Sequence, residues 1–180
     1  MRRQNGFTLI ELMTALGLTG LLLSMAVPAM GVFVANARQT GAINDLVASI
    51  HLARSTAIKS NARVTLCPSA GGTDCETVEW EQGWIAFTDL DSDQTVDVGE
   101  TILDSSGPVA ELDIDSSEFD QFLMYRPNGR VMNTTINGNS GQFTVCNDRG
   151  ADHAKVMIIQ LSGRPQLSDK QADGSTPSCS

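Results

Sequence analysis

One feature near the start of the chain limits what it can fold into: a long apolar run with a single charge. Between Phe7 and Val34 the only charged residue is Glu11. As an α-helix this run would span about 42 Å at ~1.5 Å per residue, whereas the hydrocarbon core of a membrane is ~30 Å thick. The run therefore predicts a helix that crosses a membrane once.

The residues around and within the run predict its orientation. Arg2 and Arg3 precede it, and the positive-inside rule then keeps the N-terminus in the cytoplasm and places the rest of the chain outside. A cleaved secretory signal also has a basic start and an apolar stretch, but it does not usually carry an acid within that stretch. Insertion of a carboxylate into hydrocarbon costs roughly 2.5–3.5 kcal/mol. Glu11 therefore indicates that its carboxylate pairs with another group.

The residues Gly6–Glu11 resemble the processing signal of type IV pilins and type II secretion pseudopilins. The resemblance implies that a prepilin peptidase cuts after Gly6 and methylates the new N-terminal residue, Phe7. It also implies that Glu11 neutralises the N-terminal amine of a neighbouring subunit inside a filament. Pro28 lies where many pilins carry a proline that kinks the helix.

After the apolar run, the spacing of apolar residues predicts a second helical stretch that packs on a head domain. Apolar residues recur every three or four positions, as on one face of an amphipathic helix, and Asn61 is a suitable C-cap. The stripe consists of Ile43, Leu46, Val47, Ile50, Ala53, Ala57 and Ile58. The expected divisions are a leader at 1–6, a membrane and filament-core helix at 7–34, an amphipathic helix at 35–61 and a periplasmic β-rich head at 62–180.

From residue 62 onward, alternating apolar residues and turn residues predict short antiparallel strands. The predicted strands are Arg63–Cys67, Gly83–Thr88, Glu100–Leu103, Gln121–Tyr125, Gln142–Cys146 and Lys155–Leu161. A hairpin connection is predicted at Asn147–Asp152, a surface excursion at Asp104–Asp120, and a loose polar tail after Arg164 unless Cys179 ties it down. The fold class is α+β, with a long N-terminal helix on an antiparallel sheet.

Several short motifs resemble the GspH/FimT/FimU branch of minor pilins, and together they cover most of the chain. They are Ala53-Arg54-Ser55-Thr56-Ala57, Cys67-Pro68, Gly83-Trp84, the acidic loop after Thr88, Arg126-Pro127-Asn128-Gly129 and Leu161-Ser162-Gly163-Arg164. This resemblance implies a type IV pilin-like fold and a structural subunit near the tip of a type IV pilus. The alternative is the H-type pseudopilin of a type II secretion system.

The same resemblance implies the partners and the location of the chain. The partners are other minor and major pilins or pseudopilins, the prepilin peptidase, an inner-membrane assembly platform, and membrane lipid before assembly. The chain would sit in the bacterial inner membrane with a periplasmic head, and then in a filament. Catalytic motifs such as Gly-x-Ser-x-Gly or a phosphate-binding glycine loop are missing from the sequence, so no enzyme activity is expected.

The chain has four cysteines, and an even number in an exported chain predicts two disulfides. Cys67 and Cys75 enclose a short, glycine-containing loop, so they form the favoured pair. Cys146 and Cys179 would then fix the C-terminal tail to a strand. The other connectivities remain open, because sequence alone does not determine disulfide pairing.

Acidic residues recur on alternate positions between Asp89 and Glu100, which is the ligand spacing of an EF-hand calcium loop. The candidate ligands for Ca²⁺ are Asp89, Asp91, Asp93, Thr95, Asp97 and Glu100. Gln94 departs from the pattern, because the sharp turn at this position prefers glycine. The flanking residues predict strands and not helices, so an acidic, solvated turn between two strands is the simpler interpretation, and both remain open.

DNA binding is the third functional hypothesis, and the charge of the chain argues against it. Some FimT-like pilins carry a Gly-Arg-x-Arg motif that binds DNA, but here Gly163-Arg164 is followed by Pro165-Gln166. The net charge is −9, and removal of Arg2 and Arg3 with the leader would make it −11. The remaining candidate contacts to phosphate are Arg164, Arg126, Arg130, Arg149 and Lys155.

Overall fold

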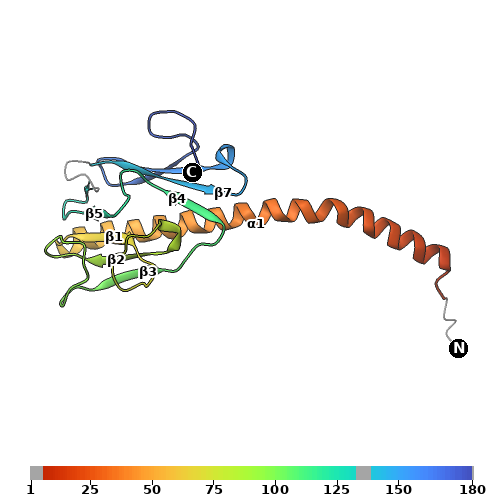
Figure 1. Cartoon of the computed structure of the whole chain (residues 1–180), viewed down its shortest axis with the longest axis horizontal. Helices are drawn as coiled ribbons and strands as arrows, with labels where there is room; N and C mark the ends of the chain where they lie inside the picture. Colours follow the sequence, from red (N-terminus) through yellow and green to blue (C-terminus); the bar gives the residue numbers. More distant parts are fainter. Residues whose placement is uncertain (1–5, 133–138, 180) are drawn as a thin grey trace. The chain divides into compact units, whose positions relative to one another are not determined.

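The computed structural model describes residues 6–132 and 139–179 (Figure 1). By its internal contacts the chain divides into two compact units, residues 1–38 and residues 39–180. The first unit contains the N-terminal part of one long helix. The second unit contains the rest of that helix and the described strands, and it is called the head below.

The long helix α1 spans Leu9–Ser60. In the first unit its large apolar side chains are exposed, from Leu9 to Val34. Within the described parts of the chain, α1 is the one helix long and apolar enough to cross a membrane, and none of its most apolar stretch is buried. A surface this apolar fits membrane anchoring, since water is a poor solvent for it.

The second half of α1 forms part of the head core, and its buried face follows the predicted stripe. The buried apolar residues are Ala42, Ile43, Leu46, Ile50, Ala53 and Ala57. Ile58 differs from the expectation, because its side chain is 47% exposed at the end of the helix. Asn61 follows the last residue of α1 and has φ 51°. Many helices end with a residue in this left-handed conformation, so Asn61 lies where the predicted C-cap was expected.

The first sheet of the head has five antiparallel strands in the order β3-β2-β1-β5-β6. The strands are β1 Val64–Pro68, β2 Trp84–Thr88, β3 Ile102–Ser106, β5 Leu123–Tyr125 and β6 Val131–Met132. The central strand β1 is buried on both faces. One face, with Val64 and Leu66, belongs to the main core, and the other, with Cys67, forms a smaller cluster with Ile85 and Phe87.

The second sheet has four antiparallel strands in the order β4-β7-β8-β9. The strands are β4 Leu112–Asp115, β7 Gly141–Asn147, β8 Lys155–Ile159 and β9 Pro165–Ser168. A short 3-10 helix, η2 Ala151–His153, lies in the connection between β7 and β8. The main core contains residues of α1, of the first sheet and of the second sheet, so the three elements bury one another (Figure 1).

Both tryptophans lie in this core. Trp80, in the short 3-10 helix η1 Trp80–Gln82, packs edge-on against Phe143 and donates its indole N–H to the carbonyl of Phe119 at 2.9 Å. Trp84 donates to the Ser49 hydroxyl at 3.0 Å. Each buried indole therefore has its hydrogen bond, as buried tryptophans require.

The prediction of a surface excursion at Asp104–Asp120 is wrong at its start, where β3 continues to Ser106, and in its second half. Strand β4 lies there, its Leu112 and Ile114 are buried, and Phe119 is fully buried beyond it. The acidic residues hid the pattern, because Leu112 and Ile114 alternate with aspartates that face outward or only partly inward. Two further strands, β6 and β9, were not predicted either.

Both disulfides of the structure lie in the head. Cys67 is bonded to Cys75, with 5.5 Å between the Cα atoms, and Cys146 is bonded to Cys179, with 6.0 Å. The second bond joins the C-terminal tail to β7. The tail is also held through β9 and through the ion pair between Lys155 and Asp169.

Candidate functional site

The predicted processing motif lies at the start of α1. The predicted leader, residues 1–6, is outside the described residues except for Gly6. Phe7 precedes the helix, and its side chain is 85% exposed. Thr8 caps the helix, because its hydroxyl oxygen accepts a hydrogen bond from the Glu11 N–H at 3.3 Å. The predicted site does not include Thr8, although the Thr-x-x-Glu spacing is a recognised helix-start pattern.

Glu11 lies in the first turn of α1 with an exposed side chain. A carboxylate in this position also complements the partial positive charge at the helix N-terminus. Its pairing with the amine of a neighbouring subunit stays a prediction. Helix α1 continues through Pro28, and the bend expected there stays a prediction as well.

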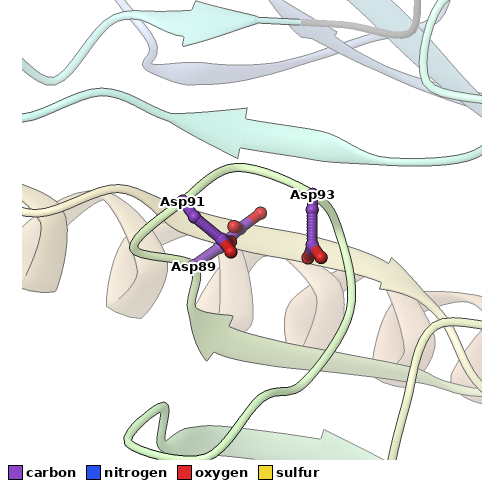
Figure 2. A group of neighbouring side chains, drawn as sticks. All are labelled: Asp89, Asp91 and Asp93. Atoms are coloured by element: carbon purple, nitrogen blue, oxygen red, sulfur yellow. The ribbon is translucent and has the colours of Figure 1, made fainter.

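The predicted calcium ligands gather in the loop that joins β2 to β3. Figure 2 shows the side chains of Asp89, Asp91 and Asp93 turned toward the inside of this loop. One carboxylate oxygen from each lies within 4.8 Å of the others. Two oxygens on opposite sides of a Ca²⁺ ion, each at 2.3–2.6 Å, are about 4.6–5.2 Å apart. The three carboxylates are thus close enough to share one ion.

Asp89 is the buried member of this group, with 0% of the residue exposed. Its Oδ2 accepts a hydrogen bond from the Thr65 hydroxyl at 2.6 Å. Its Oδ1 is buried, and no described residue makes a well-formed hydrogen bond with it. Burial raises the pKa of Asp89 above its ordinary value, although Thr65 and the backbone amides of Ser92 and Gln94 act in the opposite direction. The described residues therefore bury a carboxylate oxygen that makes no well-formed hydrogen bond, although two backbone amides lie near the carboxylate.

Glu100, at the other end of the loop, is hydrogen-bonded to the start of the loop. One carboxylate oxygen of Glu100 accepts a hydrogen bond from the Leu90 N–H at 2.6 Å, and the other accepts one from the Asp97 N–H at 3.1 Å. The nearby carboxylate of Asp93 raises the pKa of Asp97, and burial and further acids, including Asp91, add to the effect. The acidic side chains of the loop therefore lie close enough to repel one another.

Gln94 occupies the position where an EF-hand loop has glycine, and its backbone has φ 65°. Ser92, two residues earlier, has φ 73°. Glycine is preferred at such a turn because it enters the left-handed region without steric cost. The sequence departs from the EF-hand pattern at Gln94, but the backbone adopts the conformation that the pattern requires.

The Cys67–Cys75 loop supports the acidic loop. The Asp74 carboxylate accepts hydrogen bonds from the Cys75 N–H at 2.8 Å and from the Val96 N–H at 3.1 Å. Val96 also packs on the smaller apolar cluster that contains Cys67. The middle of the acidic loop is thus attached to a disulfide-bonded segment.

The cations proposed for DNA binding fall into two groups, the first of which surrounds the turn between β5 and β6. Arg126 and Arg130 belong to this turn, whose Gly129 lies against Gly163. Arg164 follows Gly163 directly and is exposed. These three arginines therefore lie near one end of the head.

The second group lies at the opposite end of β8. Arg149 contacts the His153 ring at 2.8 Å, and Lys155 pairs with Asp169. Lys155 begins β8, and the turn that leads to Arg164 follows the end of the same strand. The length of β8 therefore separates them by at least ~13 Å at ~3.3 Å per residue. The five cations do not form one continuous basic face.

Arg54 has a structural role that the sequence did not predict. Its Nε donates to the Gly129 carbonyl at 3.2 Å, and its Nη2 donates to the Ser162 carbonyl at 3.2 Å. Arg54 lies on α1, and the two carbonyls belong to turns of the two sheets. The motifs around Arg54, Gly129 and Gly163, which lie far apart in sequence, therefore meet at one junction.

A long N-terminal helix that continues into a head of antiparallel sheets defines a type IV pilin-like fold. Two crystal structures of the type IV minor pilin FimU from Pseudomonas aeruginosa (strain PAO1) share this fold. One matches with a TM-score of 0.60 and 20% identity over 82% of this chain and 99% of the FimU chain. The second crystal form gives 0.57 and 20% identity over 78% and 99%.

The minor pseudopilin EpsH of the type 2 secretion system of Vibrio cholerae aligns less well, with a TM-score of 0.48 and 11% identity over 74% of this chain and 95% of EpsH. Curated protein sequences contain no match to the chain.

Residues 42–163 match the family model described as type II transport protein GspH, and residues 1–27 match the prokaryotic N-terminal methylation motif. The chain belongs to the GspH family of minor pilins and pseudopilins. The predicted family and the predicted fold class are confirmed. The family consists of structural subunits and not of enzymes.

Proposed function

We propose that this chain is a non-catalytic minor subunit of a type IV pilus, placed at or near the tip of the filament. The observation that carries the proposal is the Gly6-Phe7 site and Glu11 at the start of an apolar helix in a member of the GspH family. Such a chain has an anchor suited to the core of a filament and a folded head suited to its surface.

The proposed assembly step depends on two charges. Cleavage after Gly6 frees the amine of Phe7, and Glu11 follows one helical turn later. In the apolar core of a filament, each of these charges alone would be costly. The Glu11 carboxylate of one subunit therefore neutralises the Phe7 amine of the next, and the pair fixes the axial register between subunits.

The proposed route begins in the inner membrane. Arg2 and Arg3 hold the N-terminus in the cytoplasm, where prepilin peptidase removes the leader and methylates Phe7. The head lies in the periplasm, where the two disulfides form. An assembly platform then transfers the subunit from lipid to a filament of other pilins.

The second candidate is the H-type pseudopilin of a type II secretion system. It is supported by the description of the matching family as type II transport proteins. The same anchor and head would then belong to a short periplasmic filament, with pseudopilins as neighbours.

The proposal can be tested in the native host with a deletion strain that is complemented by the tagged chain. We expect the mature chain to begin with methylated Phe7 by mass spectrometry, and to be recovered in pili sheared from the surface. Glu11→Ala should be processed and remain in the membrane but be lost from sheared pili. Normal pili together with a loss of secreted proteins would favour the pseudopilin, and a different mature N-terminus would contradict both candidates.

A further inference from the structure

We propose that the loop Asp89–Glu100 of the head is a binding site for one Ca²⁺ ion. The ligands are carboxylate oxygens of the aspartates and of Glu100, with the backbone carbonyl of Thr95 at the seventh position. The site does not depend on which filament the subunit enters, so it can be tested separately from the proposed function.

The unsatisfied oxygen of Asp89 is the main observation behind this site. An acidic cluster on a surface is common without any metal, because exposed carboxylates are satisfied by water. Asp89 is different, since it is fully buried and its Oδ1 makes no well-formed hydrogen bond with any described residue. It faces Asp91 and Asp93 across the inside of the loop (Figure 2). A cation at this place would supply the missing partner.

The spacing of the ligands favours Ca²⁺ over other metals. The loop offers six residues with hard oxygen donors, and nitrogen or sulfur ligands, which zinc prefers, do not occur between Asp89 and Glu100. Mg²⁺ requires a near-ideal octahedron and retains several waters, whereas Ca²⁺ accepts six to eight oxygens in a flexible arrangement. Clustered acids of this number and spacing therefore suit Ca²⁺ best.

Glu100 connects the two ends of the loop, although the three carboxylates that converge are those of Asp89, Asp91 and Asp93. Both of its carboxylate oxygens accept backbone N–H groups, from Leu90 and from Asp97. Each carboxylate oxygen has a second lone pair, so these bonds and a bidentate contact with an ion are compatible. The last ligand is thus hydrogen-bonded to Leu90, the residue after the first ligand, before an ion binds.

The surroundings of the loop predict what calcium would do. Val96 joins the loop to Asp74 and to the apolar cluster around Cys67. An ion that links the two ends of the loop would therefore stabilise the first sheet as well as the loop itself. Extracellular calcium modules bind with Kd of about 10⁻⁴–10⁻³ M, and we expect this range.

The test uses the full chain, purified in detergent with its disulfides formed and treated with a chelator. Equilibrium dialysis with labelled Ca²⁺ should give one bound ion per chain. The fluorescence of Trp80 and Trp84, both buried in the head, should show a rise in Tm of about 4–8 °C at about 10 mM Ca²⁺. The same concentration of Mg²⁺ should produce a much smaller shift.

The variant Asp91→Asn/Asp93→Asn should lose the bound ion and the rise in Tm. Both side chains are exposed, so the head should fold without them. The control Asp115→Asn/Asp120→Asn removes the same charge from exposed positions outside the loop and should bind calcium as the wild type does. Failure of the wild type to bind one ion by dialysis, or binding that survives in Asp91→Asn/Asp93→Asn, would overturn the proposal.

Discussion

The Tyr125 hydroxyl donates a hydrogen bond to the carbonyl oxygen of Gly163 at 2.8 Å in the interior of the head. Tyr125 ends strand β5 of the first sheet, and Gly163 lies in the turn before β9 of the second. The bond therefore joins the two sheets directly. It lies beside Arg54, whose guanidinium connects α1 to the same two turns.

The first prediction concerns the loss of this bond in Tyr125→Phe. The substitution keeps the buried ring but leaves the Gly163 carbonyl without its donor. An unsatisfied buried acceptor costs about 1–3 kcal/mol, so the free energy of unfolding should fall by this amount. Chemical denaturation followed by tryptophan fluorescence measures it. An unchanged midpoint would mean that water replaces the hydroxyl.

The second prediction concerns the ionisation of Tyr125, which is the single tyrosine of the chain. Burial raises its pKa above the ordinary value of 10.0, and the nearby Arg54 only partly opposes this. The folded head then holds the phenolic proton more tightly than the unfolded chain does. Stability from this source is complete below pH 10 and is lost as the pH rises above it.

Near-UV absorbance should therefore show no phenolate at pH 10 while the head is folded, and phenolate should appear together with unfolding. The chemically unfolded chain, as the control, should titrate near pH 10. A phenolate that forms near pH 10 without any change in tryptophan fluorescence would show that Tyr125 is accessible to solvent.

The third prediction compares two glycines with similar backbones. Gly163 has φ 71°, and a Cβ placed there would lie 2.2 Å from the Gly129 carbonyl oxygen. Gly174 has φ 85°, and a Cβ there meets nothing within 4 Å. Gly174→Ala should cost only the strain of the left-handed backbone, about 1 kcal/mol. Gly163→Ala should cost at least 3 kcal/mol, since its neighbour is backbone. Equal losses in chemical denaturation would refute the steric argument.

The fourth prediction concerns the disulfide that holds the tail. Cys146 and Cys179 are 33 positions apart, and in the chain-entropy description such a cross-link contributes about 3–4 kcal/mol. The variant Cys146→Ala/Cys179→Ala should lose about this much stability. Limited proteolysis should also cut it between Asp169 and Ser175, where we expect the wild type to resist. An intact tail in the variant would show that β9 alone is sufficient to hold it.

The fifth prediction separates the buried charge of Asp89 from its role toward calcium. In chelator, Asp89→Asn should be as stable as the wild type or about 1 kcal/mol more stable, because a neutral amide is cheaper to bury than a carboxylate. With calcium present the order should reverse, since only the wild type binds the ion. A variant that is less stable in chelator would show that the protein itself satisfies the Asp89 carboxylate.

The sequence predicted the elements whose pattern is local. The stripe on α1 was predicted because helical spacing repeats every three or four residues; of its members, Val47 is partly buried and Ile58, at the helix end, is exposed. The acidic loop was visible because its ligands alternate along the chain. Strand β4 was missed, because its aspartates outweighed the alternation of Leu112 and Ile114.

The remaining features depend on contacts between distant segments. Nothing near Asp89 in the sequence indicates that its Oδ1 lacks a partner, because the burial comes from the packing of β1 and β2. The motifs at Arg54, Gly129 and Gly163 were each noticed as resemblances, but their common junction appears only in three dimensions. The left-handed backbone of Gln94 could not be predicted either, since glutamine does not usually adopt this conformation.

The position of β9 has a consequence for biosynthesis. A ribosome delivers residues from the N-terminus onward, so the anchor segment emerges long before Pro165–Ser168 and Cys179. The sheet of β7 and β8 is complete only when Pro165–Ser168 has paired with β8. Cys146 can form its native disulfide only when Cys179 is present. Translocation of the segment from Pro165 to Cys179 should therefore commit the newly made chain to its native state, and a truncation before Pro165 should leave a product that proteases degrade.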